Sequence, residues 1–272
     1  MEYLLFAWPE VVRRVRNAED ILLLSDYDGT LTPIVERPEL AELPDTTRML
    51  LQKLAHHQKF RVGIISGRAI SDLKELVGMD GIIYAGNHGL EIEGPGFKFI
   101  NPLAEDLMPL LHLLHRVLVQ SLTFIKGAFV EDKGLTLSVH YRQVDESQAS
   151  EVANAVESIV STSRAVGKVK TTTGKKVYEV RPAVDWDKGK AIQLITDKHT
   201  PKKRRSLVIF LGDDRTDEDG FKVVNRYGGV SIFVGEENTE SNAAYFLRSP
   251  NEVERFLELL LDPKVRLDNE LG

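Results

Sequence analysis

The sequence predicts an α/β protein in which a parallel sheet forms the core and an α+β unit is inserted. Short apolar runs end in polar or glycine-rich tips at 21–25, 60–65, 81–85 and 207–211, as buried parallel strands do. A helical pattern over 46–57 lies between the first two runs. This alternation of strand, helix and strand indicates parallel neighbours joined by right-handed crossovers.

The middle of the chain has a different pattern, which predicts helix, hairpin, helix and hairpin. Helices are expected over 102–120 and 146–161, and alternating strands over 127–131, 135–141, 168–172 and 176–180. The parallel-core pattern resumes after Pro182. We therefore expect a discontinuous core of residues 1–103 and 182–272, with residues 104–181 as an inserted cap that can act as a lid.

Composition places the chain among globular proteins. Of its 272 residues, 42% are hydrophobic and 28% are charged, and no apolar stretch approaches the length of a membrane span. The net charge of -6 argues against nucleic-acid binding, and the basic run at 202–205 is typical of a solvated loop. The absence of cysteine excludes disulfides and cysteine nucleophiles. The apolar patch at 3–8 lacks the basic start of a signal peptide, so we expect a cytoplasmic location.

Asp26 and Asp28 follow the first apolar run directly and are themselves followed by Gly29. In an extended chain their side chains project to the same side, where two carboxylates repel each other. A hard divalent cation such as Mg²⁺ offsets that repulsion. The alternative is an ordinary strand-to-turn corner, because Asp and Gly are common turn residues.

Two further segments carry groups suited to binding phosphate. Ser66 and Arg68 follow the second run, where a hydroxyl and a guanidinium can both donate to phosphate oxygens. Ser66 could instead cap a helix over 69–76. Lys188 could neutralise a nucleophilic carboxylate and a phosphate oxygen together, although a solvated lysine at a helix start is the simpler interpretation.

An acidic cluster follows the last of these runs. Asp213, Asp214 and Asp217 come directly after it, and they form a cation site if Asp26 is adjacent in space. The same acids also favour the start of the following helix, whose dipole they complement. We expect Asp213 to lie nearest the sheet and the later acids to orient ligands.

The order of these motifs resembles the haloacid dehalogenase (HAD) superfamily of phosphotransferases, and the segments 66–68, 86–91 and 212–219 narrow the resemblance to the trehalose-6-phosphate phosphatase family. The resemblance implies a HAD-like Rossmannoid sheet with Mg²⁺ as cofactor. It implies that Asp26 attacks phosphorus to form an aspartyl-phosphate and that Asp28 is the general acid and base. Mg²⁺ would be held by the Asp26 side chain, the Asp28 carbonyl and Asp213. Ser66 and Lys188 would hold the phosphate.

The resemblance extends to polar residues that would bind the sugar. In the core these are Arg68, Asn87, His88 and Glu91, and in the insertion they are Glu131, Lys133, His140, Arg142, Glu179 and Arg181. Such side chains suit a polyhydroxylated ligand. Without the resemblance, the charges of the insertion would be interpreted as exposed hairpin residues.

The resemblance thus implies hydrolysis of trehalose-6-phosphate, a small-molecule sugar phosphate. A trehalose-phosphate synthase is a possible functional partner, and we expect no binding to nucleic acid or membrane. One alternative is a phosphatase of another glycosyl phosphate, of the sucrose-phosphate or mannosyl-glycerate type. Another is a non-catalytic sugar-phosphate sensor, against which the presence of both Asp26 and Asp28 argues.

Overall fold

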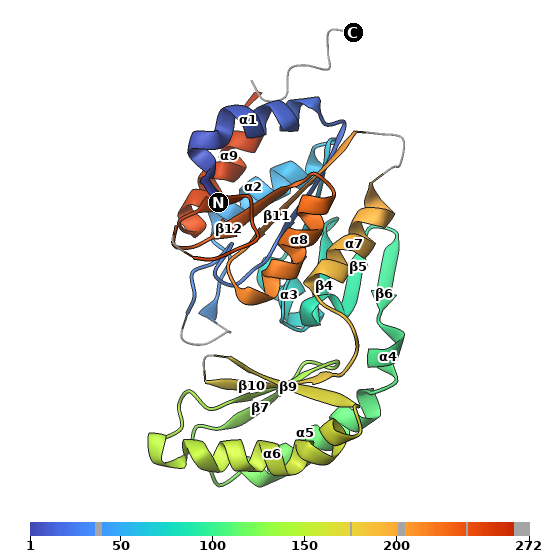
Figure 1. Ribbon diagram of the computed structural model, residues 1–272, viewed down its shortest axis with the longest axis vertical. Helices are drawn as coiled ribbons and strands as arrows, with labels where there is room; N and C mark the ends of the chain where they lie inside the picture. Colours follow the sequence, from blue (N-terminus) through green and yellow to red (C-terminus); the bar gives the residue numbers. More distant parts are fainter. Residues whose placement is uncertain (36–39, 175, 201–204, 238, 264–272) are drawn as a thin grey trace. The chain divides into compact units, whose positions relative to one another are not determined.

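The computed structural model describes residues 1–35, 40–174, 176–200, 205–237 and 239–263 (Figure 1). It divides into two compact units, one formed by Met1–Lys98 with Trp186–Gly272 and the other by Phe99–Asp185. The second unit contains the segment for which we predict an insertion. Of the basic run predicted to be a solvated loop, residues 202–204 lie outside the described residues.

The first unit is built on a sheet in the order β1-β13-β12-β11-β2-β3-β4-β5-β6. Along this order, each of the seven strands from β1 to β4 is parallel to the next, and β5 is antiparallel to β4. The runs predicted as parallel strands are thus four adjacent strands of this sheet, β11, β2, β3 and β4. The strands are β1 (Glu2–Tyr3), β2 (Asp20–Ser25), β3 (Phe60–Ile65), β4 (Ile83–Gly86), β5 (Glu91–Gly94), β6 (Phe97–Ile100), β11 (Ser206–Gly212), β12 (Val230–Val234) and β13 (Tyr245–Leu247).

Helices cover both faces of this sheet, which is why its central strands contain continuous apolar runs such as 21–24 and 207–211. Leu23 and Ile209 join a core cluster with α1, α2, α3 and α9, whereas the Phe210 ring lies 5.4 Å from that of Phe221 on α8. Figure 1 shows α1 and α9 together, and α7 beside α8. The helices are α1 (Leu4–Asn17), α2 (Asp45–His56), α3 (Ile70–Val77), α7 (Lys188–His199), α8 (Glu218–Arg226) and α9 (Pro250–Leu261), with short 3₁₀ turns η2 (Asn87–Gly89) and η4 (Arg215–Asp217).

The second unit is a four-stranded antiparallel sheet in the order β7-β8-β10-β9, with two long helices packed on it (Figure 1). Its core joins Leu111 and Leu118 of α5, Val156 of α6 and Val139 of β8. Side chains alternate along each strand, so every second residue projects from the opposite face. The elements are α4 (Pro102–Glu105), α5 (Met108–Leu122), β7 (Phe129–Asp132), β8 (Leu137–His140), η3 (Glu146–Gln148), α6 (Ala149–Ala165), β9 (Val169–Gly174) and β10 (Val177–Pro182).

The structure differs from the predicted elements at two places. The single helix predicted over 102–120 is two helices, α4 and α5, because Pro109 lies in the first turn of α5 and has no N–H with which to continue a helix from α4. The hairpin of β5 and β6 was not predicted. Its turn contains Gly96 at φ 68°, a conformation that glycine adopts without strain.

None of the helices among the described residues is long and apolar enough to cross a membrane.

Candidate active site

The predicted core residues lie along the edge of the sheet where parallel strands end. Asp26 follows β2, Ser66 follows β3 and Asp213 follows β11. Strands β11 and β2 are in parallel register, with Leu211 opposite Ser25, and the Asp26 N–H donates to the Leu211 carbonyl at 2.8 Å. In open α/β sheets this is the edge at which ligands bind.

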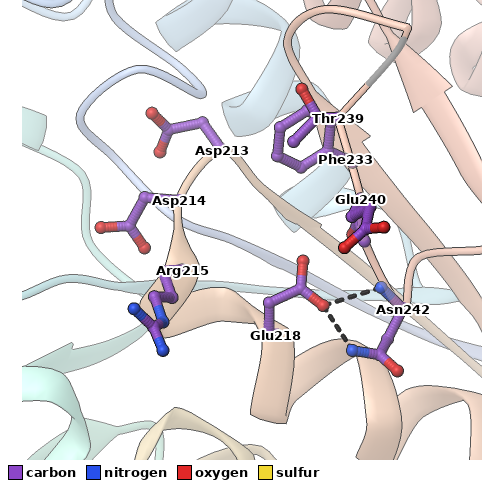
Figure 2. Close-up of a pocket in the computed structure, with 9 residues that line it drawn as sticks. Asp213, Asp214, Arg215, Glu218, Phe233, Thr239, Glu240 and Asn242 are labelled. Carbon is purple, nitrogen blue, oxygen red and sulfur yellow. Dashed lines mark hydrogen bonds between the residues drawn. The ribbon is translucent and has the colours of Figure 1, made fainter.

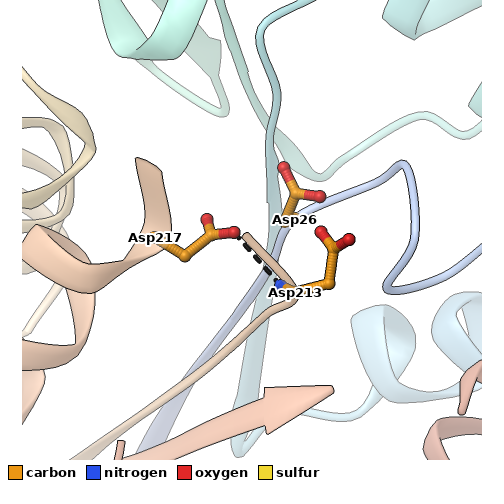
Figure 3. Close-up of side chains that lie close together, drawn as sticks. All are labelled: Asp26, Asp213 and Asp217. Carbon is orange, nitrogen blue, oxygen red and sulfur yellow. Dashed lines mark hydrogen bonds between the residues drawn. The ribbon is translucent and has the colours of Figure 1, made fainter. Parts of the chain in front are cut away.

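Three carboxylates meet at this edge. Asp26, Asp213 and Asp217 each offer an oxygen atom, and these atoms all lie within 4.8 Å of one another (Figure 3). Burial and the neighbouring carboxylates raise the pKa of Asp26 well above its usual value, against the opposing effect of Lys188. Burial and the same repulsion raise the pKa of Asp213 to about 7 and that of Asp217 to about 6. The cluster is therefore short of positive charge.

Lys188 supplies part of that charge. It is the first residue of α7, its side chain is only 3% exposed, and its Nζ donates to Asp26 Oδ1 at 2.6 Å and to Asp217 Oδ1 at 2.7 Å. Burial opposes the charged form of Lys188, but the two carboxylates outweigh burial and raise its pKa. The simpler interpretation of a solvated lysine is therefore wrong.

The other acids of the β11 tip shape the loop. Asp217 is fully buried, and its Oδ2 accepts the N–H groups of Asp213 and Asp214 at 3.1 Å each. Asp214 Oδ1 accepts from the N–H and the hydroxyl of Thr216, both at 2.7 Å, and so caps the turn η4. Burial would raise the pKa of Asp214, but Lys188 and these hydrogen bonds lower it. Asp217 thus holds both Lys188 and the loop that carries Asp213.

Asp28 has a different partner from Asp26. Strand β2 ends at Ser25, so both aspartates lie in the turn that follows rather than within the strand. Arg68 holds the Asp28 carboxylate through two hydrogen bonds, Nε to Oδ2 at 2.7 Å and Nη2 to Oδ1 at 2.5 Å. The Asp28 side chain is 41% exposed, whereas that of Asp26 is buried. The two carboxyl groups therefore occupy the distinct environments that distinct roles require.

Ser66 is buried at the end of β3 and does not cap α3. The helix begins at Ile70 with Ala69 as its N-cap, and the Ser66 Oγ instead accepts the N–H of Arg68 at 3.2 Å. A hydroxyl both accepts and donates. The Ser66 hydroxyl can therefore still donate its hydrogen to a phosphate oxygen.

The turn η2 after β4 holds the predicted residues Asn87 and His88, both at positive φ (50° and 57°). Asn87 Nδ2 donates to Glu91 Oε1 at 2.8 Å, and the Ile70 N–H donates to the same oxygen at 3.1 Å. The His88 N–H donates to the Ser66 carbonyl at 2.8 Å. Left-handed backbone at non-glycine residues is uncommon and costs energy, so the surrounding hydrogen bonds must hold it.

Trp186 also belongs to this region, although nothing in the sequence around it predicts a role. Its Nε1 donates to the Gly89 carbonyl at 2.8 Å, which links the segment before α7 to η2. The two residues are 97 positions apart. A pairing over that distance leaves no local pattern in the sequence.

A cavity of about 690 Å³ opens beside the carboxylate cluster (Figure 2). Within it, Glu218 Oε2 accepts two hydrogen bonds from Asn242, one from the backbone N–H and one from Nδ2, each at 2.7 Å. Its lining residues are Asp213, Asp214, Arg215, Glu218, Phe233, Thr239, Glu240, Ser241 and Asn242. Asp213 therefore belongs both to the cavity lining and to the carboxylate cluster.

Gly29 makes room for Asp213. It has a φ of 83°, and a Cβ built on it would lie 2.0 Å from Asp213 Oδ2. We expect Gly29→Ala to lower turnover at this site at least about tenfold and to cost about 1–2 kcal/mol of unfolding free energy, because it strains the backbone and displaces this carboxylate. Gly81→Ala is the matched control, since Gly81 has a φ of 76° with nothing within 4 Å of the added Cβ. Urea unfolding and turnover are measured for both; equal activity in the two variants contradicts the prediction.

In the second unit, most of the predicted sugar-binding residues lie on one face of the sheet. His140 Nε2 lies 2.8 Å from Glu131 Oε2, and Lys133 Nζ lies 3.8 Å from both Glu131 Oε2 and Glu179 Oε1. Arg181 is two residues from Glu179 on β10 and so shares its face. Arg142 follows β8 and is exposed.

A buried lysine paired with an aspartate at the end of a central parallel strand is the arrangement on which HAD hydrolases operate, and the fold and the site together define this class. A family model described as trehalose-phosphatase matches residues 24–251. The chain belongs to the trehalose-phosphatase family, and it is a phosphoric monoester hydrolase.

Individual relatives agree with this assignment. Probable trehalose-phosphate phosphatase 3 of Oryza sativa subsp. japonica is 35% identical over 282 residues, which cover 97% of this chain and 76% of that protein. Trehalose-phosphate phosphatase B of Arabidopsis thaliana is 35% identical over 266 residues, covering 94% and 70%. The solved C-terminal domain of trehalose-6-phosphate phosphatase from C. albicans superimposes with a TM-score of 0.77 at 27% identity, covering 93% of this chain and 95% of that one.

Proposed function

We propose that this chain hydrolyses trehalose-6-phosphate to trehalose and phosphate, with Mg²⁺ as cofactor and an aspartyl-phosphate as intermediate. The observation that carries the proposal is the buried pair of Asp26 and Lys188 beside Asp213 and Asp217. The choice of substrate rests on the relatives, which are named for trehalose-phosphate. The choice of reaction rests on the residues of the site.

The acidic cluster fits a hard divalent cation. Its three carboxylates converge within 4.8 Å, and burial together with the neighbouring carboxylates raises the pKa of Asp213 and of Asp217. A bound cation would offset both effects. We assign Mg²⁺ to Asp26, the Asp28 carbonyl and Asp213, with Asp214 and Asp217 orienting the ligands or bound water. When bound, Mg²⁺ would neutralise negative charge on the phosphate.

The chain's own residues carry the reaction in two steps. An Asp26 carboxylate oxygen attacks phosphorus and the bond from phosphorus to the sugar oxygen breaks. Asp28, protonated on an oxygen that Arg68 releases when substrate binds, gives its proton to the sugar oxygen. Asp28 then takes a proton from water as the water attacks phosphorus, and the bond to Asp26 breaks to release phosphate. Lys188 and Ser66 hold the phosphate oxygens throughout, because phosphoryl transfer depends mainly on position and charge.

Phosphate release from a panel of sugar phosphates tests the proposal. The panel contains trehalose-6-phosphate, glucose-6-phosphate, a sucrose phosphate and a mannosyl-glycerate phosphate, each with Mg²⁺ and with EDTA. We expect the highest kcat/KM for trehalose-6-phosphate, loss of activity in EDTA and its return on adding Mg²⁺. A higher kcat/KM for another ester would show that trehalose-6-phosphate is not the preferred substrate. Tight binding of a sugar phosphate without turnover would show that the protein is a sensor and not an enzyme.

Arg68 is expected to position the general acid. Its two hydrogen bonds fix both oxygens of Asp28, and lysine cannot reproduce such a fork. We expect Arg68→Lys to lower kcat for trehalose-6-phosphate by about ten- to a hundredfold, and to lower kcat much less for p-nitrophenyl phosphate, whose leaving group needs no proton. Equal losses for the two substrates would show that Arg68 acts on the phosphate instead.

For the sugar, we propose contacts from polar residues of the second unit. The support is their hydrogen-bonding groups and, for all but Arg142, the face of the sheet that they share. These residues are Glu131, Lys133, His140, Arg142, Glu179 and Arg181. Sugar contacts from Arg68, Asn87, His88 and Glu91, the cytoplasmic location and the link to a trehalose-phosphate synthase stay predictions.

A further inference from the structure

An aromatic side chain stands on the face of the second unit's sheet that carries its polar residues. Phe129 of β7 and His140 of β8 are paired across the antiparallel strands, and their rings stack with centroids 4.5 Å apart and an interplanar angle of 13°. The adjacent residues Val130 and Val139 pack into the core with α5 and α6. The stacked pair therefore projects from the face opposite the helices.

Hydrogen bonds and ion pairs hold this stack in place. The imidazole Nε2 of His140 lies 2.8 Å from Glu131 Oε2, and Lys133 lies 3.8 Å from Glu131. The side chains of His140 and Lys133 are only 16% and 10% exposed. Because the imidazole is fixed, the phenyl ring stacked on it has a defined orientation.

Phe129 nevertheless remains 45% exposed. A singly exposed aromatic residue is common and by itself indicates nothing. Phe124, which follows α5, is 91% exposed and has no such polar surroundings among the described contacts. What distinguishes Phe129 is that its ring adjoins a row of hydrogen-bonding groups, the combination of apolar surface and a few placed polar groups that small-molecule sites use.

We propose that Phe129, stacked on His140, is a platform for the apolar face of a glucose ring of the substrate. This inference rests on the proposed function. A pyranose presents C–H groups on one face and hydroxyls around its rim. The negative face of an aromatic ring attracts those C–H groups, while Glu131 and Lys133 bind the hydroxyls. Phe129 is thus a specificity-determining residue.

Two substitutions of Phe129 test this role, because they distinguish the effect of the aromatic ring from the effect of apolar side-chain volume. Phe129→Leu keeps apolar volume but loses the ring, and Phe129→Tyr keeps the ring. For trehalose-6-phosphate we expect Phe129→Leu to raise KM about fivefold with little change in kcat, and Phe129→Tyr to stay within about twofold of wild type. For acetyl phosphate, which has no sugar, both variants should match wild type.

Phe124→Leu is the matched control and should leave both substrates unchanged. The inference is overturned if Phe129→Leu leaves KM for trehalose-6-phosphate unchanged while the wild type hydrolyses it. It is also overturned if Phe129→Leu lowers hydrolysis of both substrates equally. That result would indicate a disturbed fold, which a lower unfolding midpoint would detect. Failure of the wild type to hydrolyse trehalose-6-phosphate overturns the proposed function, and this inference with it.

Discussion

An Asp26→Asn variant is expected to release phosphate from trehalose-6-phosphate at least about a thousandfold more slowly than the wild type, because an amide cannot form the acyl-phosphate. Asparagine keeps the size of the side chain and an oxygen that can still accept from Lys188, whose Nζ lies 2.6 Å from Asp26 Oδ1. The fold should therefore survive. Loss of turnover with an unchanged unfolding midpoint would show that Asp26 serves the reaction and not the fold.

Asp45→Asn makes the same chemical change at a fully exposed side chain on α2 and serves as the control, with activity expected to match the wild type. Acid quenching during turnover gives a second measurement. Wild-type enzyme should carry covalent phosphate that hydroxylamine removes, and the Asp26→Asn variant should carry none. Full activity in Asp26→Asn would refute the assignment even if the hydrolysis itself were established.

The parallel core could be predicted from local pattern because its strands are buried on both faces. The run Ile21, Leu22, Leu23, Leu24 is apolar at every position, since alternate residues face different helix layers. The strand ends were also visible, because each apolar run gives way to polar residues or glycine at the edge of the sheet. Knowing which ends share an edge then required only the rule that parallel strands end together.

Other elements were hidden because tertiary packing overrides local signals. The helix α1 contains Pro9, a residue that normally ends helices, yet Leu4 and Val11 on either side of it are fully buried in the core. The β5 strand reads Glu91, Ile92, Glu93 and has a single buried apolar residue. Pro9 thus hid a helix whose buried residues Leu4, Ala7, Val11 and Val15 have helical spacing, and β5 is too short for its alternation to stand out.

The partners within the site could not be predicted from pattern alone. Asp28 and Arg68 are 40 residues apart, and Lys188 lies 162 residues from Asp26. The polar segment around Lys188 has the composition of an exposed helix start. Its burial follows from ion pairing at long range, so local composition suggested the opposite environment.

Lys188→Met should lower activity by about a hundredfold or more and also destabilise the protein by about 3 kcal/mol in EDTA. The activity falls because the phosphate loses a cation. The stability falls because the variant leaves Asp26 and the fully buried Asp217 without the ammonium that donates to each. Lys53→Met, on the exposed side of α2, makes the same change and should alter neither quantity.

A double variant separates these two effects. Adding Asp217→Asn to Lys188→Met removes one of the two uncompensated charges, so urea unfolding should recover about half of the lost free energy. Activity should stay low, because the phosphate still lacks its lysine. If the double variant is no more stable than Lys188→Met, the pair does not stabilise the fold as an ion pair. Recovery of stability without recovery of turnover would show that one buried lysine holds the loop through Asp217 and serves the reaction through Asp26.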